Sequence, residues 1–149
     1  MKIVLANDHG ALNLKNLVKE HLQKKGIEVI DIGCNSTESV DYPDFGEKAA
    51  LMVSNKEGDL GMLFCGTGIG ISLAANKVAN IRCAVVTDTF SAKMSRAHNN
   101  ANMLALGERV VGFGLALELV DAFLNTEFEG DRHQRRVDKL MKIEAKYKK

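Results

Sequence analysis

The chain has little of several features that would assign it to a specialised class of protein. Its net charge is only +1 over 149 residues, which gives no general electrostatic reason to expect nucleic acid or a membrane surface as a partner. No apolar run is long enough to span a bilayer, and no signal peptide is expected before the strand-like residues that follow Lys2. Repeats, low-complexity tracts and linkers are missing as well. We therefore expect a single domain over residues 1–149 with a hydrophobic core.

Cysteine is also scarce. The three cysteines, Cys34, Cys65 and Cys83, make an odd set without a C-x-x-C pair. This pattern argues against a disulfide framework and against a zinc site, and it favours a reducing compartment, so we expect a cytoplasmic protein. Because free cysteines are often buried and inert, Cys34 and Cys83 are most simply a loop residue and a strand residue.

Short apolar runs alternate with amphipathic segments along the chain. The expected strands are Lys2–Ala6, Ile27–Ile32, Leu60–Cys65, Arg82–Thr87 and Asn102–Leu106. The expected helices are Ala11–Lys25, Pro43–Asn55, Ile69–Lys77, Thr89–Ala97, Gly114–Asn125 and a basic helix from about Asp131. Gly26 is expected to end the first helix, and Asp88 or Thr89 to cap the fourth. Strict alternation predicts an α/β fold in which helices cover both faces of a five-stranded parallel sheet.

Ligands of such sheets bind beyond the carboxyl ends of the strands. The polar candidates flank three strands: Asp8 and His9 follow the first, Cys65 and Thr67 follow the third, His98 and Asn99 precede the fifth, and Arg109 follows it. We expect the fold to gather these side chains at one edge. Taken alone, Asp8 is also explained as a helix cap and His98 as a helix-terminal histidine.

The segment Leu60–Ile71 carries the strongest chemical signal. A buried strand ends at Cys65, and the glycine-rich stretch 66–70 leads into a helix. Glycine lets a ligand approach the backbone amides, and a helix N-terminus favours anions and activates a nearby thiol. The segment predicts a reactive thiol that faces a developing negative charge. A tight β–α turn with a buried cysteine is an equally good explanation of this segment alone.

Nucleotide motifs fit this loop less well. Position 71 is Ile, so the last glycine of G-x-G-x-x-G is missing, and no P-loop sequence occurs. Asp88 does lie about twenty residues downstream, where dinucleotide-binding folds hold a ribose. A non-catalytic nucleotide-binding module therefore stays open as an alternative.

The charge is unevenly distributed. Residues 131–149 hold eight Lys or Arg and three Asp or Glu, a local charge of +5, and the remainder of the chain carries −4. Arg132 and Arg136 share one helix face, and two guanidiniums suit a phosphate. Arg109 is a further candidate for the same anion. The simpler explanation of the basic segment is a solvated helix surface.

Seven segments together resemble type B ribose-5-phosphate isomerase, a family that is grouped with the galactose-6-phosphate isomerase subunits. They are Asn-Asp-His-Gly at 7–10, Asp-Tyr-Pro-Asp-Phe at 41–45, Cys-Gly-Thr-Gly-Ile-Gly-Ile at 65–71, Ala-Ala-Asn-Lys at 74–77, Ser-Arg-Ala-His-Asn at 95–99, Gly-Glu-Arg-Val-Val-Gly at 107–112 and Arg-His-Gln-Arg-Arg-Val at 132–137. The resemblance covers nearly the whole chain in order.

The resemblance implies a Rossmann-like three-layer α/β/α sandwich with a C-terminal helix. It implies a homodimer or tetramer whose active sites lie at a subunit interface, without a metal or organic cofactor. The implied reaction is the interconversion of ribose 5-phosphate and ribulose 5-phosphate through an enediolate.

The resemblance also assigns roles to individual residues. Cys65 would be the base that moves the proton between C2 and C1, and His98 would help to open the sugar ring. Thr67 and the amides of Gly66, Gly68 and Gly70 would hold the enediolate oxygens. Asp8 and Asn99 would bind sugar hydroxyls, and the phosphate would be held by His9, Arg109, Arg132 and Arg136.

Two departures bear on the substrate and the base. Ile71 stands where one branch of the family has a glutamate base, which favours the cysteine branch. The segments around His98 and the C-terminal arginines resemble the galactose subgroup less, which favours ribose. Allose 6-phosphate and galactose 6-phosphate stay open as alternative substrates. A non-catalytic partner subunit is a weaker alternative, since such a subunit needs no complete set of these residues.

Overall fold

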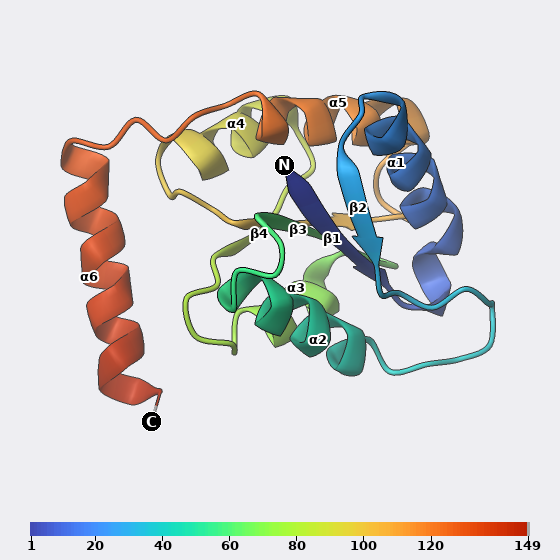
Figure 1. Cartoon of the computed structure of the whole chain (residues 1–149), viewed down its shortest axis with the longest axis horizontal. Helices are drawn as coiled ribbons and strands as arrows, with labels where there is room; N and C mark the ends of the chain where they lie inside the picture. Colours follow the sequence, from blue (N-terminus) through green and yellow to red (C-terminus); the bar gives the residue numbers. More distant parts are fainter. Residues whose placement is uncertain (149) are drawn as a thin grey trace.

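The computed structural model describes residues 1–148, which form a five-stranded parallel sheet with helices on both faces (Figure 1). The strands are β1 (Lys2–Asn7), β2 (Glu28–Asp31), β3 (Leu60–Cys65), β4 (Cys83–Val85) and β5 (Met103–Gly107). Their order across the sheet is β2-β1-β3-β5-β4, and every neighbouring pair is parallel. The predicted α/β fold with a parallel sheet is confirmed.

The helices form the two outer layers. They are the 3-10 turn η1 (His9–Ala11), α1 (Leu12–Lys24), α2 (Tyr42–Ser54), α3 (Ile69–Ala75), α4 (Thr89–Ala97), α5 (Phe113–Leu124) and α6 (Arg132–Tyr147). Helices α1, α4 and α5 cover one face of the sheet, and α2 and α3 cover the other (Figure 1). No helix within residues 1–148 is long and apolar enough to cross a membrane.

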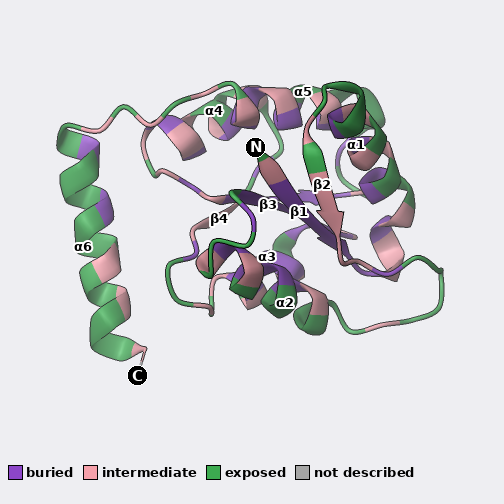
Figure 2. Cartoon of the chain, in the orientation of Figure 1, coloured by how far each residue is buried: buried purple, intermediate pink, exposed green. Residues whose placement is uncertain are grey.

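Alternation along the strands explains why both faces are covered. Ile3 and Leu5 pack into one apolar core, and Val4 and Ala6 pack into the other. All six residues of the central strand β3 are buried, as its continuous apolar sequence requires (Figure 2). The carboxyl end of β3 is therefore held rigidly between two packed layers.

Local signals set the helix ends where the sequence predicts them. Gly26 adopts a φ of +73°, and the Ile27 N–H donates to the Leu22 carbonyl at 3.1 Å, which closes α1 as a glycine C-cap does. The Asp88 carboxylate accepts a hydrogen bond from the Ser91 N–H at 2.7 Å and caps α4.

Four elements are shorter than expected, and of these α1 (expected Ala11–Lys25) and β2 (expected Ile27–Ile32) each lack one residue at either end. Helix α3 ends at Ala75 and not at Lys77, and β4 covers only Cys83–Val85 and not Arg82–Thr87. The Asn76 side chain explains where α3 ends and where β4 begins, because it accepts from the Cys83 N–H at 2.8 Å and donates to the Cys83 carbonyl at 2.9 Å. This side chain joins the end of the helix to the start of an edge strand, which pairs only with β5.

Helix α6 stands apart from the other layers (Figure 1) and is exposed along most of its length (Figure 2). Its C-terminal half is anchored to the body of the protein. Glu144 accepts from the Asn80 N–H at 2.9 Å, and Lys148 donates to the carbonyls of Asn76 and Val78 at 2.8 and 3.1 Å. On the same helix the large apolar side chains of Leu140 and Ile143 are 47% and 57% exposed.

Gly107 tests how tightly the end of β5 packs on the glycine-rich loop. A Cβ at this position would lie 2.6 to 2.7 Å from backbone atoms of Thr67, closer than real contacts allow. We expect Gly107→Ala to lower the free energy of unfolding by about 1–3 kcal/mol through overpacking. Urea denaturation measures this. The control is Gly114→Ala in α5, where a Cβ meets no atom within 4 Å. An equally small effect of both substitutions would contradict the packing argument.

Candidate active site

One group of polar residues lies where the strands end. Asn7 is paired with Phe64 and Cys65 with Gly107, so the residues that follow β1, β3 and β5 meet at one edge of the sheet. We call Asp8, His9, Cys65, the loop Gly66–Gly70 and Arg109 the carboxyl-edge cluster.

Arg109 joins the parts of this cluster. A Cβ on Gly66 would lie 3.6 Å from Nη1 of Arg109, and one on Gly10 would lie 3.9 Å from its Nη2 and 3.3 Å from Oδ1 of Asp8. The guanidinium thus spans the start of the glycine-rich loop and the end of β1. The guanidinium is exposed and lies beside glycine backbone that carries no side chain, so an anionic group of a ligand can approach it.

Cys65 is the buried centre of the cluster. The residue is 4% exposed at the end of β3, and its Sγ accepts a hydrogen bond from the Gly68 N–H at 3.1 Å. Gly68 has a φ of +78°, and a Cβ there would lie 2.9 Å from the backbone of Leu106, so only glycine fits. This turn aims an N–H at the sulfur, where it can stabilise negative charge. The Gly68 N–H contacts the thiol here, which differs from its expected role as a donor to a substrate.

The rest of the loop is fixed by its neighbours. Thr67 is exposed, and its Oγ1 accepts from the Ile69 N–H at 3.2 Å. Gly70 packs against the ring of Tyr42, where a Cβ would lie 2.8 Å from the nearest ring carbon. Sequence reasoning assigned no role to Tyr42, although it belongs to one of the segments that carry the family resemblance.

Asp8 and His9 leave β1 in fixed orientations. The Oδ1 of Asp8, a buried residue, accepts from the Gly10 N–H at 2.9 Å, so the expected helix-capping contact is present. The Nδ1 of His9 lies 3.1 Å from the Val40 N–H and accepts its hydrogen bond. In a neutral imidazole the proton must then sit on Nε2, which leaves an N–H donor for a ligand.

A second group of polar residues surrounds the turn after α4. His98 stacks on His133 with 4.2 Å between ring centroids and 10° between ring planes. The side chain of Arg82 donates to the carbonyls of Asn99 and Asn100 at 2.9 to 3.1 Å and holds this turn. We call His98, Asn99, Arg132, His133 and Arg136 the amino-edge cluster.

The expectation that all polar candidates gather at one edge is wrong for His98 and Asn99. A residue that precedes a parallel strand lies at the amino end of that strand, opposite to the residues that follow it. Arg132 and Arg136 lie with them, on the helix that carries His133. Figure 1 shows β1 running away from the side of the molecule where α6 stands. The two clusters thus lie at opposite ends of the sheet.

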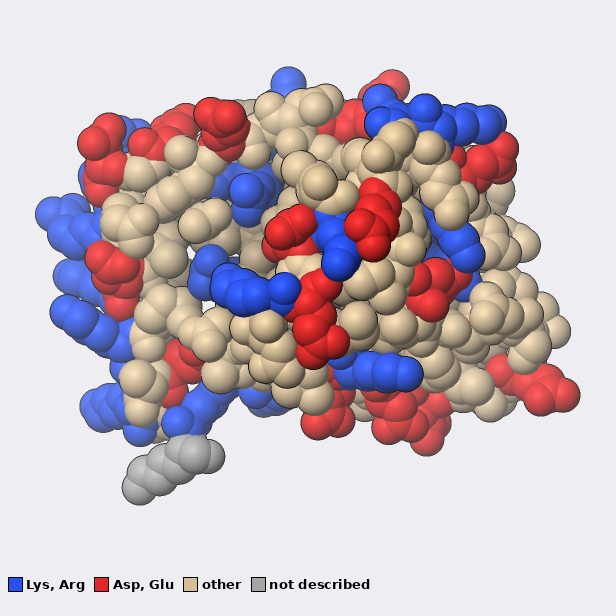
Figure 3. Space-filling model, in the orientation of Figure 1, with Lys and Arg blue, Asp and Glu red and all other residues tan. Residues whose placement is uncertain are grey.

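The amino-edge cluster is electropositive. Lys and Arg side chains gather along α6 (Figure 3). Burial lowers the pKa of His133 below its ordinary value of 6.5, and the nearby charges of His98, Arg132 and Arg136 lower it further. His133 was not singled out from the sequence, although it lies between the two arginines that were. By contrast, burial raises the pKa of Cys83 to about 12, which agrees with an inert strand cysteine.

Within residues 1–148, one group of side chains has the composition of a metal site. Ligand atoms of His98, Glu129 and His133 all lie within 4.8 Å of one another. The two rings are stacked nearly parallel, however, and imidazole lone pairs lie in the ring planes, so they do not converge on one ion. The arginines of α6 also disfavour a cation. The arrangement is better described as a histidine pair.

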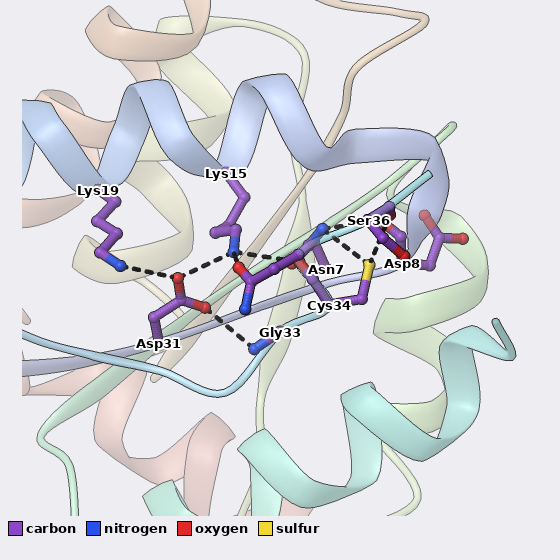
Figure 4. A network of polar contacts seen from close by, with 9 residues as sticks. Asn7, Asp8, Lys15, Lys19, Asp31, Gly33, Cys34 and Ser36 are labelled. Atoms are coloured by element: carbon purple, nitrogen blue, oxygen red, sulfur yellow. Dashed lines mark hydrogen bonds and ion pairs between the residues drawn. The ribbon is translucent and has the colours of Figure 1, made fainter. Parts of the chain in front are cut away.

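A third polar group lies beneath the end of β2 (Figure 4). The Nζ of Lys15, a fully buried residue, donates to Oδ2 of Asp31 at 2.9 Å, and Lys19 donates to the same oxygen at 3.1 Å. Burial raises the pKa of Asp31, but hydrogen bonds from the two lysines and the Gly33 N–H outweigh it, so the pKa lies below 3.8. The sequence shows Lys15 only as one lysine of an amphipathic helix.

Comparison with known proteins gives a consistent result. The profile of the family described as "Ribose/Galactose Isomerase" matches residues 3–140. Ribose-5-phosphate isomerase B of Escherichia coli is 48% identical over 145 residues, which cover 97% of each chain. The solved structure of ribose-5-phosphate isomerase B from Clostridium thermocellum is 57% identical, with a TM-score of 0.98 and 99% of each chain covered. That of Mycoplasma genitalium, with bound ribulose 5-phosphate, is 44% identical, with a TM-score of 0.92 and 97% of this chain and 96% of that chain covered.

The substitution Asp31→Asn tests how the hydrogen bonds from Lys15 and Lys19 to Asp31 contribute to stability, because this contribution depends on pH. The folded state lowers the pKa of Asp31, so its carboxylate stabilises the fold above the ordinary value of 3.8, and this contribution is lost as the pH falls below that value. We expect wild type to be more stable than the variant at about pH 7 and the difference to shrink towards about pH 3. Urea denaturation at both pH values measures it. A difference that does not change with pH would exclude this role of the carboxylate.

Proposed function

Because the chain belongs to the Ribose/Galactose Isomerase family, we propose that it interconverts D-ribose 5-phosphate and D-ribulose 5-phosphate as part of pentose phosphate metabolism. The single observation that carries this proposal is the Cys65 thiol, buried at the end of β3 with the Gly68 N–H aimed at its sulfur and Arg109 beside its loop. The names of its E. coli and C. thermocellum relatives agree with this substrate.

The chemistry requires a positioned base and donors for an oxyanion. A proton on the carbon next to a carbonyl is weakly acidic, so Cys65, as thiolate, would remove the C2 proton of the open-chain aldose and return it to C1. The intermediate enediolate carries negative charge on its oxygens. The Thr67 hydroxyl and the amides of Gly66 and Gly70 would stabilise them, and one such donor is worth about 3 kcal/mol. The Gly68 N–H, expected to join them, would instead stabilise the Cys65 thiolate.

The phosphate would be held away from the reacting carbons. The Nε2–H of His9 and the Arg109 guanidinium belong to the carboxyl-edge cluster. Binding energy gained there positions C1 and C2 against the base without requiring a cofactor or metal. Asp8, beside His9, would bind sugar hydroxyls.

We further propose that the working enzyme is a homodimer with composite active sites, with a tetramer as the alternative. The amino-edge cluster of one copy would meet the carboxyl-edge cluster of the other, so that His98 assists ring opening, Asn99 binds a hydroxyl, and Arg132 and Arg136 complete the phosphate site. Exposed apolar residues support such an interface, since Leu73 and Phe90 are 59% and 71% exposed.

The alternatives differ in their support. The carboxylate of Asp88, the main argument for a nucleotide-binding module, is the cap of α4 and bonds the Ser91 N–H. Allose 6-phosphate and galactose 6-phosphate would use the same chemistry, and only turnover separates them from ribose. We also propose a single domain over residues 1–149 and a cytoplasmic location, which the three free cysteines support.

The proposed base is tested by turnover without added metal or cofactor. We expect ketose formation from ribose 5-phosphate, and a fall in kcat of about a hundredfold to ten-thousandfold in Cys65→Ala. Cys83→Ala, which removes the inert thiol, is the matched control. Allose 6-phosphate and galactose 6-phosphate are assayed in parallel. Turnover that survives Cys65→Ala would contradict the assignment of Cys65 as the base. A preference for one of the hexose phosphates would change the proposed substrate but not the chemistry. If folded protein turns over none of the three sugar phosphates, the proposed isomerase activity is rejected.

The composite site is tested by mixing two defective subunits. We expect Cys65→Ala and His98→Asn each to be strongly impaired as homodimers. A mixed dimer would keep one site with both native residues, so random reassembly should restore about a quarter of wild-type activity. The double variant Cys65→Ala/His98→Asn, mixed with wild type under the same conditions, controls for simple dilution. If mixing the two single variants restores nothing, the residues act within one subunit.

A further inference from the structure

Lys15 is a charged side chain that the proposed mechanism does not use. It lies in α1 with no exposed surface, and a buried ammonium is costly unless all its donors are paired. Its Nζ donates to Oδ2 of Asp31 at 2.9 Å, to Oδ1 of Asn35 at 2.9 Å and to the carbonyl of Cys34 at 3.2 Å (Figure 4). These three bonds use all three donors of the ammonium group.

Two of the three acceptors belong to the segment 32–41 that joins β2 to α2. This segment contains no helix or strand. Its first residues are held to β1 by the backbone N–H groups of Ile32 and Cys34, which donate to the Leu5 and Asn7 carbonyls at 2.9 and 3.5 Å, and the Lys15 side chain adds an anchor at Cys34 and Asn35. Next to the Lys15 anchor, Sγ of Cys34 accepts from Nδ2 of Asn7 at 3.3 Å, and the same Nδ2 donates to the Asp8 carbonyl at 2.8 Å. A Cβ on Gly33 would lie 2.0 Å from Oδ1 of Asn7, which shows how closely the segment passes β1.

The other end of the segment reaches the carboxyl-edge cluster. The backbone N–H of Val40 donates a hydrogen bond to Nδ1 of His9 at 3.1 Å. This bond selects the tautomer and the orientation of the ring, as a partner on one nitrogen generally does. The segment therefore links a buried ammonium in α1 to a proposed phosphate ligand.

We propose that Lys15 is a positioning residue for substrate binding: by anchoring Cys34 and Asn35 it holds the segment 32–41 so that Val40 directs the Nε2–H of His9 towards the substrate phosphate. The role rests on the proposed function. A buried ion pair adds little net stability compared with apolar packing, but it fixes geometry through directed bonds. Lys19 differs from Lys15 in both respects, because its side chain is 36% exposed and, within residues 1–148, bonds only Asp31.

The test compares Lys15→Met with Lys19→Met in the full-length enzyme. For Lys15→Met we expect KM for ribose 5-phosphate and the inhibition constant of inorganic phosphate to rise about tenfold, as for the loss of one good hydrogen bond, with kcat changed less than about threefold. Lys19→Met should leave all three constants within about twofold. A purely structural role would lower the melting temperature and the active fraction without moving KM.

A double-mutant cycle locates the effect. In a His9→Ala background we expect Lys15→Met to leave KM unchanged, because the two substitutions would disturb one interaction. Equal effects of Lys15→Met with and without His9 would overturn the proposal, and so would an unchanged KM in folded Lys15→Met. Should Lys15→Met fail to fold, Asn35→Ala removes one anchor and is expected to raise KM about threefold.

The nitrogen-15 shifts of the His9 ring give a readout that does not depend on turnover. Wild type should show the Nε2–H tautomer, and Lys15→Met a mixture of tautomers. Wild type without ribose 5-phosphate turnover would reject the proposed function but leave this tautomer test intact. An unchanged His9 spectrum in Lys15→Met would reject the positioning role alone.

Discussion

The common direction of the five strands is the constraint on which the rest of the structure depends. Because every neighbouring pair is parallel, residues that follow strands share one edge of the sheet and residues that precede strands share the other. Cys65 and Arg109 therefore lie at the same edge of the sheet within one chain. His98 cannot join them there, since it comes before β5 and not after it. The common strand direction alone divides the polar residues between two clusters at opposite edges of the sheet.

The carboxyl-edge cluster depends in turn on close backbone contacts that only glycine permits. The left-handed Gly68 turns its N–H back to the Cys65 sulfur, and Gly107 lets the end of β5 pack on Thr67. Each contact comes from a different strand–helix connection, so the loop is held on both sides. This rigidity would suit the proton transfer proposed for Cys65, because a base must stay within hydrogen-bonding reach of the proton that it moves.

Features set by local sequence were predictable, and features set by distant contacts were not. The buried run of β3, the glycine end of α1 and the Asp88 cap follow from a few neighbouring residues, and the structure has all three. His98 was placed wrongly because it lies next to β5 in the sequence, and the prediction did not take into account that it precedes this strand and so lies at its amino end. Lys15 was missed for a different reason: its acceptors lie sixteen to twenty residues away, and nothing in an amphipathic pattern separates a buried lysine from an exposed one.

Along helix α6, the residues that anchor it and the residues proposed to bind phosphate lie in different halves. Its C-terminal half is tied down by Glu144 and Lys148, which bond the segment after α3. Its N-terminal half carries exposed Arg132 and Arg136 beside the buried His133. Both guanidiniums are exposed, and the remainder of the chain outside residues 131–149 is net negative. A helix fixed at one end and charged at the other fits the proposed dimer, in which its arginines would reach a phosphate bound by a second copy.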